Sequence, residues 1–176
     1  AKQKESNAGI TAPLSDHQIK AIITNPNFTY DIKQLVAAVG QSVGKQREHN
    51  EDSVLALTST VSGSADNVPF GLYIVADGMG GHQFGEVASN AAIRIMAGNI
   101  TKKFHSYLYN LPTQSLQISL QEVMESSVME AHQYVQREAP GSGTTLTAAL
   151  VLGQQMTIAH VGDSRAYSIH PDGSIV

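Results

Sequence analysis

Residues 70–90 read FGLYIVADGMGGHQFGEVASN, and this stretch joins a strand to a helix through an acidic, glycine-rich turn. An apolar β-prone run ends at Ala76, Asp77 follows at once, and a helical pattern begins near Gly85. The strand holds the carboxylate on a rigid element, and the glycines allow backbone carbonyls to approach a ligand. Oxygen ligands of this kind suit Mg²⁺ or Mn²⁺ rather than zinc. Asp-Gly is also a common turn, so this stretch alone does not establish a metal site.

Composition narrows the class of protein. The chain has 176 residues, of which 41% are apolar, enough for one domain with a sizeable core. Its net charge is −4 and its basic residues are scattered, which argues against a nucleic-acid or anionic-membrane surface. There is no cysteine, so disulfides and thiolate metal sites are excluded. The sequence shows no secretory leader pattern and no apolar run long enough to cross a bilayer, and we expect a cytoplasmic location.

Two regions differ in composition. Residues 1–34 are interpreted as an N-terminal extension that begins with a polar, flexible tail. A capping-box pattern at Ser15 and the Asn25-Pro26 stop predict a short helix over residues 16–24. Residues 35–176 are interpreted as a separate domain.

The periodicity of this second region predicts an α+β fold. Helical spacing of apolar residues predicts helices over 85–104 and 115–138. Strands are predicted over 35–43, 53–57, 69–76, 146–152, 156–161 and 165–169, with a loop over 58–67 and a turn over 171–174. Methionines 96, 124 and 129 fall at helical spacing and are interpreted as filling the core. Strands followed by two helices and then a meander indicate helices packed against antiparallel sheet.

Three acidic turns lie at predicted strand ends. The first holds Arg47, Glu51 and Asp52, the second Asp77, Gly78 and His82, and the third Asp163, Ser164 and Arg165. Each alone has an ordinary explanation, because Glu-Asp pairs are commonly solvated and Gly-Asp-Ser is a common turn. Their order along the chain, with Gly-Thr-Thr at 143–145, is what carries information.

The pieces R-x-x-N-E-D, V-A-D-G-M-G-G-H-x-x-G-E-x-A-S, G-T-T and G-D-S-R-x-Y occur in the order found in a known family. From about Leu35 to Ile169 the chain resembles the bacterial form of the metal-dependent serine/threonine protein phosphatases, the type-2C or PPM family. The resemblance implies a layered α-β-β-α sandwich of antiparallel sheets flanked by long helices. Residues 35–176 resemble the N-terminal part of such a domain, and the sandwich is therefore expected to be incomplete here.

The resemblance also implies roles for five metal-site residues. Asp77 is similar to the carboxylate that bridges two Mg²⁺ or Mn²⁺ ions, and Gly78 to the residue whose carbonyl binds one of them. Glu51 and Asp52 resemble acids that hold metal-bound waters or contact the metals directly, and both alternatives stay open. Asp163 resembles the ligand of a third, weaker ion.

Two further residues resemble catalytic groups. Arg47 is similar to the guanidinium that receives the substrate phosphate, and its planar fork suits two phosphate oxygens. His82 resembles the general acid that protonates the leaving alkoxide, a role suited to a side chain that titrates near neutrality. In the implied mechanism a metal pair activates water and clamps the phosphate during an in-line attack.

The resemblance implies hydrolysis of phosphoserine and phosphothreonine in proteins, a role in signalling, and a paired serine/threonine kinase as partner. In the family pattern, two further metal-binding aspartates follow later in the chain, and residues 1–176 do not include them. This segment alone is therefore expected to be inactive. The alternative is a catalytically inactive phosphatase-like module that binds phosphoproteins or a partner chain.

Overall fold

A computed structural model describes residues 15, 17, 35–45, 49–62, 67–80, 83–109 and 119–176. The chain divides into two units, Ala1–Asp31 and Ile32–Val176, and the fold given below is that of the second. The helix predicted over 16–24 lies almost wholly outside the described residues. The domain boundary predicted between residues 34 and 35 stays a prediction.

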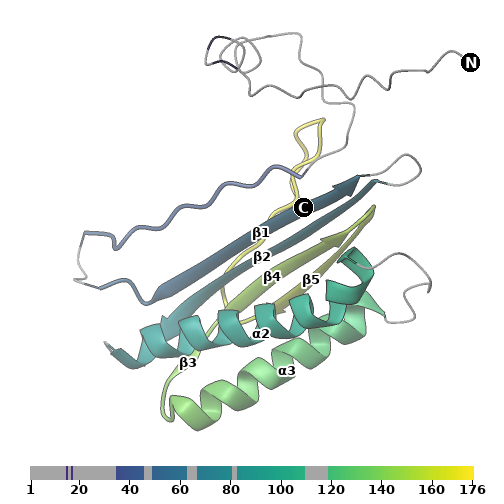
Figure 1. The fold of residues 1–176 in the computed structure, drawn as a ribbon. Helices are drawn as coiled ribbons and strands as arrows, with labels where there is room; N and C mark the ends of the chain where they lie inside the picture. Colours follow the sequence, from purple (N-terminus) through teal and green to yellow (C-terminus); the bar gives the residue numbers. More distant parts are fainter. Residues whose placement is uncertain are drawn as a thin grey trace, which may run out of the picture. The chain divides into compact units, whose positions relative to one another are not determined.

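The central strand of the sheet is β2, Asn67–Met79, which contains the apolar run seen in the sequence. It pairs antiparallel with β1, Asp52–Ser62, on one side and with β4, Leu146–Leu152, on the other. The strand β5, Gln155–Val161, pairs with β4, and the short β3, Gly143–Thr144, pairs with the last residues of β2. The order β1-β2-β4-β5 gives one antiparallel sheet (Figure 1).

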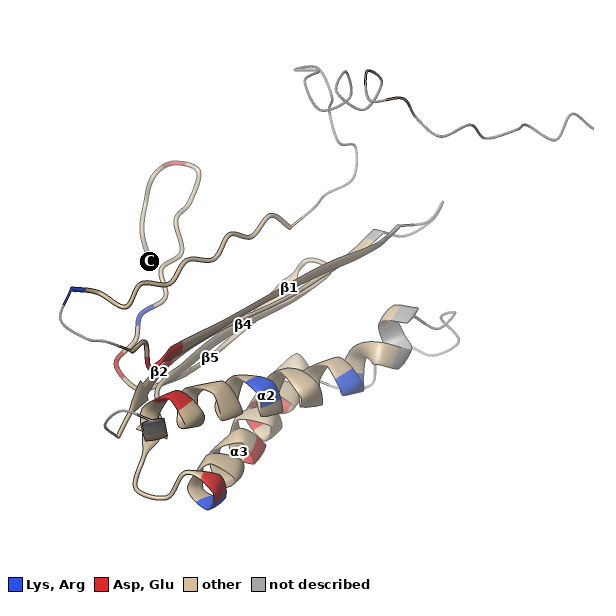
Figure 2. Ribbon diagram, turned by 60° about the vertical axis from the view of Figure 1, so that its left-hand side comes forward, with Lys and Arg blue, Asp and Glu red and all other residues tan. Residues whose placement is uncertain are grey.

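Two helices cover one face of this sheet. They are α2, Gln83–Tyr109, and α3, Leu120–Glu138, and the side view shows both on the same side of the strands (Figure 2). Alternate residues of β2 point toward them, as the two-residue period of a strand requires. The buried apolar side chains include residues of β2 (Phe70, Leu72, Ile74, Ala76), β4 (Leu146, Ala148, Leu150), α2 (Ala88, Ala92, Ile93, Met96, Ala97, Ile100, Phe104, Leu108) and α3 (Val123, Met124, Ala131, Val135). The α+β class is therefore confirmed, and the described residues form one helical layer and one sheet of the expected sandwich.

The opposite face of the sheet carries apolar side chains that are partly or largely exposed. We call this the open sheet face, and by strand register it comprises Val54, Tyr73, Val75, Val151, Met156 and Ile158. Val75, Met156 and Ile158 are each about half exposed. Leu35 lies over part of this face, because a Cβ added to Gly71 would come within 2.8 Å of its Cδ1.

Several sequence-based boundaries are wrong. Residues 35–43 form no strand in the part of the chain that the structure describes, because no neighbouring strand pairs with them there. The loop predicted over 58–67 is largely strand, because β1 stays paired with β2 as far as Ser62. The β-branched side chains of Thr58 and Thr60 suit that pairing, although their polarity suggested a loop.

The end of the chain also differs from the prediction. Residues 165–169 do not extend the meander from β5; instead, Ile169 forms an isolated bridge with Ile175. Ser168 and Val176 exchange two backbone hydrogen bonds of 2.7 and 2.9 Å around the turn at 171–174. The predicted turn is confirmed, and the run after it pairs backward on the preceding residues.

Helix α3 corrects one core assignment. Met96 and Met124 are buried as predicted, but Met129 is 51% exposed, so its assignment to the core is wrong. Helical spacing places Met129 on the outer side of α3, away from the face that contacts α2 and the sheet. No described helix combines the length and apolar character needed to cross a membrane.

Candidate metal centre

The acidic residues of the first two turns meet at one end of the sheet. Asp52, the first residue of β1, lies directly opposite Asp77 of β2 in the register. Residues directly opposite in an antiparallel pair point to the same face, with Cβ atoms about 4.5–5.5 Å apart. Both side chains are exposed on the side of the open sheet face. Figure 2 shows acidic ribbon segments where β1 begins.

Asp77 lies within β2. The sequence instead suggests that the strand ends at Ala76 and that Asp77 follows it. The ladder continues through Gly78 and Met79, which pair with Thr144 and Gly143. The polar groups of the Asp77 backbone are both bonded, because its N–H donates to Thr145 Oγ1 at 3.0 Å and its carbonyl accepts from Thr145 N at 2.8 Å. The carboxylate is thus carried on a fixed segment of backbone.

Glu51 and Asp52 point in different directions. The Glu51 carboxylate lies against Gly85 in the first turn of α2, because a Cβ at Gly85 would come within 3.0 Å of Glu51 Cδ. The positive end of a helix dipole favours an acidic group there. The Asp52 side chain is instead paired with Asp77. The two adjacent acids therefore have different surroundings in the structure, a difference that the sequence alone did not predict.

Gly78 is buried between these elements. Its N–H donates to the Glu51 carbonyl at 3.2 Å, and a Cβ on it would come within 2.7 Å of the same oxygen and still closer to the Gly85 carbonyl. Only glycine allows the end of β2 to approach the start of α2 this closely. The structure thus explains Gly78 by packing, and its role as a carbonyl ligand stays a prediction.

A buried hydroxyl fixes the segment that carries Glu51. Ser89 of α2 is fully buried and donates to the Glu51 carbonyl at 2.6 Å. Ser53 bonds the same hydroxyl at 2.9 Å. Ser89 is the last residue of the motif V-A-D-G-M-G-G-H-x-x-G-E-x-A-S, but the sequence alone assigned no role to its hydroxyl.

Asp163 lies in the turn after β5, close to the same end of the sheet. The neighbouring Ser164 hydroxyl bonds Thr145 Oγ1 at 2.7 Å, and Thr145 is the residue that holds the Asp77 backbone. Two strand spacings of about 4.8 Å separate the turn from Asp77 across the sheet. The structure therefore brings the second and third acidic turns to the same end of the sheet, but it does not place Asp163 beside Asp52.

Arg47 and His82, the two predicted catalytic residues, lie outside the described residues. Another histidine, His160, bonds Thr147 Oγ1 at 2.9 Å and the Gly162 carbonyl at 3.0 Å. It is therefore a hydrogen-bonded residue of β5. Asp172 belongs to the terminal turn, where bonds from the Ser174 hydroxyl and N–H lower the pKa of its carboxyl. Asp172 thus lies in an ordinary hydrogen-bonded turn.

The donor set fits a hard divalent cation in chemistry but is small. Two carboxylates on one face of adjacent strands are the oxygen ligands that Mg²⁺ and Mn²⁺ prefer. Among the residues that the structure describes, no three acidic or histidine side chains converge closely enough to hold a metal ion. The described residues therefore do not by themselves complete a metal site.

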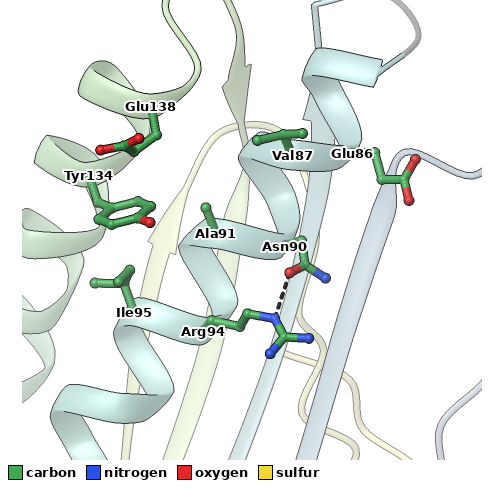
Figure 3. Close-up of a pocket in the computed structure, with 8 residues that line it drawn as sticks. All are labelled: Glu86, Val87, Asn90, Ala91, Arg94, Ile95, Tyr134 and Glu138. Atoms are coloured by element: carbon green, nitrogen blue, oxygen red, sulfur yellow. Dashed lines mark hydrogen bonds between the residues drawn. The ribbon is translucent and has the colours of Figure 1, made fainter.

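Apart from the acidic residues, a concave surface lies between the two helices. A hollow of about 810 Å³ is lined by residues of α2 and α3 (Glu86, Val87, Asn90, Ala91, Arg94, Ile95, Tyr134 and Glu138). Figure 3 shows Arg94 donating to Asn90 along α2, with Tyr134 and Glu138 on α3. No sequence motif pointed to this hollow, and we assign no ligand to it.

Comparison with known proteins defines the class to which this fold and acidic edge belong. The family model of protein phosphatase 2C matches residues 36–175. The chain therefore belongs to the protein phosphatase 2C family.

Individual relatives are bacterial serine/threonine phosphatases. The chain is 38% identical over 130 residues to the serine/threonine phosphatase stp of Listeria innocua, covering 73% of this chain and 48% of that protein. It is 34% identical over 134 residues to the serine/threonine protein phosphatase PstP of Mycobacterium tuberculosis, covering 75% of this chain and 22% of the relative. This chain spans about half the length of the Listeria relative.

One similar crystal structure is that of the catalytic domain of PstP in complex with two manganese ions. It is 32% identical to this chain, with a TM-score of 0.49, and the alignment covers 75% of this chain and 49% of the other.

Proposed function

We propose that the complete protein hydrolyses phosphoserine and phosphothreonine in proteins, with Mg²⁺ or Mn²⁺ as cofactor. The observation that carries this proposal is the pairing of Asp52 with Asp77 across β1 and β2. Two carboxylates side by side on one face of neighbouring strands present the oxygen ligands that Mg²⁺ and Mn²⁺ prefer. Family membership and the phosphatase relatives support the same reading.

Within this proposal the chain's own residues hold and orient the acids. Asp77 and Asp52 would ligate the metal ions. Glu51, which lies beside the first turn of α2, would either hold a metal-bound water or contact a metal ion. Bound ions supply Lewis acidity that lowers the pKa of water and offsets phosphate charge. Thr145 and Ser89 fix the backbone next to Asp77 and Glu51. Arg47 as phosphate clamp, His82 as general acid and Asp163 as ligand of a third, weaker ion remain predictions.

The proposal extends to the substrates, the partner kinase and the cellular location of the complete protein. The phosphatase relatives support phosphorylated proteins as substrates. A paired serine/threonine kinase, a signalling role and a cytoplasmic location are inferred from the family resemblance and the composition alone. Cell fractionation and phosphoproteomics of a deletion strain test them, and a rise in phosphothreonine on cytoplasmic proteins is the expected result.

The activity itself is tested with the complete gene product and a phosphothreonine peptide. We expect turnover that requires Mn²⁺ or Mg²⁺ and is lost in Asp77→Asn, because the Asp77 carboxylate would hold the metal ions that activate water. Glu125→Gln, at an exposed position of α3, is the matched control and should keep wild-type turnover. Normal turnover in Asp77→Asn contradicts the proposal. Phosphopeptide binding without turnover in the wild type would instead support the inactive module.

A further inference from the structure

The residue that holds Asp77 is Thr145, the second threonine of Gly-Thr-Thr. Its side chain is 2% exposed. Val75 lies opposite Thr147 and Gly78 opposite Thr144, so the unbroken register places Asp77 opposite Thr145. Thr145 N donates to the Asp77 carbonyl at 2.8 Å, which is one half of the expected ladder pair. The other half is unusual.

In a regular ladder the Asp77 N–H would donate to the Thr145 carbonyl. Here it donates to Thr145 Oγ1 at 3.0 Å. The one hydroxyl proton of Thr144 lies within reach of two acceptors, the Thr145 carbonyl at 2.9 Å and the Asp77 carbonyl at 3.0 Å. A side-chain hydroxyl has thus replaced a backbone acceptor at the one position of β2 that carries the acid. The backbone of Asp77 therefore depends on the identity of residue 145, which an ordinary ladder would not require.

The same hydroxyl reaches the third acidic turn. Thr145 Oγ1 lies 2.7 Å from Ser164 Oγ. Gly162 packs on the other side of the same side chain, because its φ is +104° and a Cβ there would come within 2.7 Å of Thr145 Cγ2. The turn that carries Asp163 is therefore fitted around Thr145, with its hydroxyl bonded to Ser164 and its methyl group against Gly162.

We propose that Thr145 is a positioning residue that couples Asp77 to the Asp163 turn through one buried hydroxyl shared by Asp77 N–H and Ser164. This inference rests on the proposed metal-dependent function, because the coupling matters for metal binding at Asp77. It adds that the affinity at Asp77 depends on Ser164, a residue two strands away. Partners that orient metal ligands typically change metal affinity by about 10–100-fold when removed.

The test uses the 176-residue chain and three variants: Thr145→Val, which removes the hydroxyl and keeps the shape, Thr145→Ser, which restores it, and Ser164→Ala. Two quantities are measured, the hydrogen-exchange rate of the Asp77 amide and the Mn²⁺ affinity from the electron paramagnetic resonance signal of free Mn²⁺. Thr101→Val is the matched control, because it deletes a hydroxyl bonded only within α2, to the Ala97 and Gly98 carbonyls.

We expect Thr145→Val to speed exchange at Asp77 and to weaken Mn²⁺ binding about 10-fold. Thr145→Ser should restore most of both, and Thr101→Val should change neither. Ser164→Ala should weaken Mn²⁺ binding less than Thr145→Val does, and the double variant should be no weaker than Thr145→Val, because both act through one hydroxyl.

Several results would overturn the coupling. Unchanged Asp77 exchange in Thr145→Val removes Thr145 as the positioning residue. Additive losses in the double variant remove the shared hydroxyl. If Thr145→Val does not fold, Ser164→Ala decides, and wild-type Mn²⁺ affinity and Asp77 exchange in that variant contradict the proposal. A wild-type chain that binds no Mn²⁺ counts against the proposed metal-dependent function, whereas Asp77 exchange still tests the coupling.

Discussion

At the scale of single residues, Gly78 shows how the acidic edge constrains the sequence. Its backbone is pressed between the carbonyls of Glu51 and Gly85, so even one added methyl group has nowhere to go. The atoms in the way are backbone atoms, which cannot move aside as a flexible side chain can. The approach of β2 to α2 therefore requires glycine at this position.

We expect Gly78→Ala to lower the free energy of unfolding by about 1–3 kcal/mol, the usual cost of overpacking. Gly98 is the matched control, because it lies inside α2 with nothing within 4 Å of an added Cβ. Gly98→Ala should raise stability by about 0.5–1 kcal/mol, since alanine is the better helix former. Urea denaturation measures both. Equal stability of Gly78→Ala and the wild type would show that the close approach is not required.

At the scale of elements, α3 is held to α2 and the sheet by one side only. Met124 is almost fully buried, whereas Met129, five residues later, is 51% exposed. Five residues correspond to about 500° of helical rotation, which moves a side chain to a different side of the helix. Spacing alone suggested that both methionines fill the core, but the structure separates them.

Met124→Ala should therefore cost about 2–5 kcal/mol of stability, because it leaves a cavity between α2 and α3. Met129→Ala should change stability by no more than about 0.5 kcal/mol, as surface substitutions usually do. Thermal or urea unfolding of the two variants compares them directly. A loss at Met129 as large as that at Met124 would mean that the outer side of α3 is covered in solution.

The elements also show what a sequence can and cannot predict. The apolar run before Asp77 and the helical spacing after Gly85 correctly predict β2 and α2, because their burial follows from local patterns. Residues 35–43 have the composition of a strand, but a strand also needs a neighbour, and pairing is not visible in local composition. The same limitation hid the extension of β1 through Thr60, which depends on β2.

The acidic site was predictable only in part. Motif spacing selected Asp52, Asp77 and Asp163, and the structure places the first two directly opposite each other. The sequence could not assign different roles to Glu51 and Asp52. Adjacent residues of an extended segment point in opposite directions, but the sequence does not tell which direction leads to the site. The hydroxyl of Thr145 was missed as an acceptor for the Asp77 N–H, since a single hydrogen bond across 68 residues leaves no periodic signal.

At the scale of the whole chain, the open sheet face is the main departure from a closed core. Val75, Met156 and Ile158 are each about half exposed on neighbouring strands. In the part of the chain that the structure describes, β1 and β5 each pair with a strand on one side only. Contiguous apolar surface together with such edge strands favours association. The layered sandwich of the family would place a second sheet against this face.

We expect the 176-residue chain to self-associate at micromolar concentrations, and Ile158→Lys to reduce the association by placing a charge on the open sheet face. Met129→Lys is the matched control, since it adds the same charge to an exposed position of α3 and should leave association unchanged. Sedimentation velocity measures all three. A wild-type chain that stays monomeric, or equal effects of both lysines, would show that this face does not mediate association.

The most direct test of the central claim, that Asp52 and Asp77 form part of a divalent metal site, is the Mn²⁺ affinity of this chain measured by electron paramagnetic resonance. We expect weak binding of a single ion, because among the described residues two carboxylates are paired at this end of the sheet and no third acid joins them. Asp77→Asn should weaken the binding further, by at least about 10-fold. Asp172→Asn, in the terminal turn, should bind as the wild type does. Unchanged affinity in Asp77→Asn, or two tight sites in the wild type, would contradict this account.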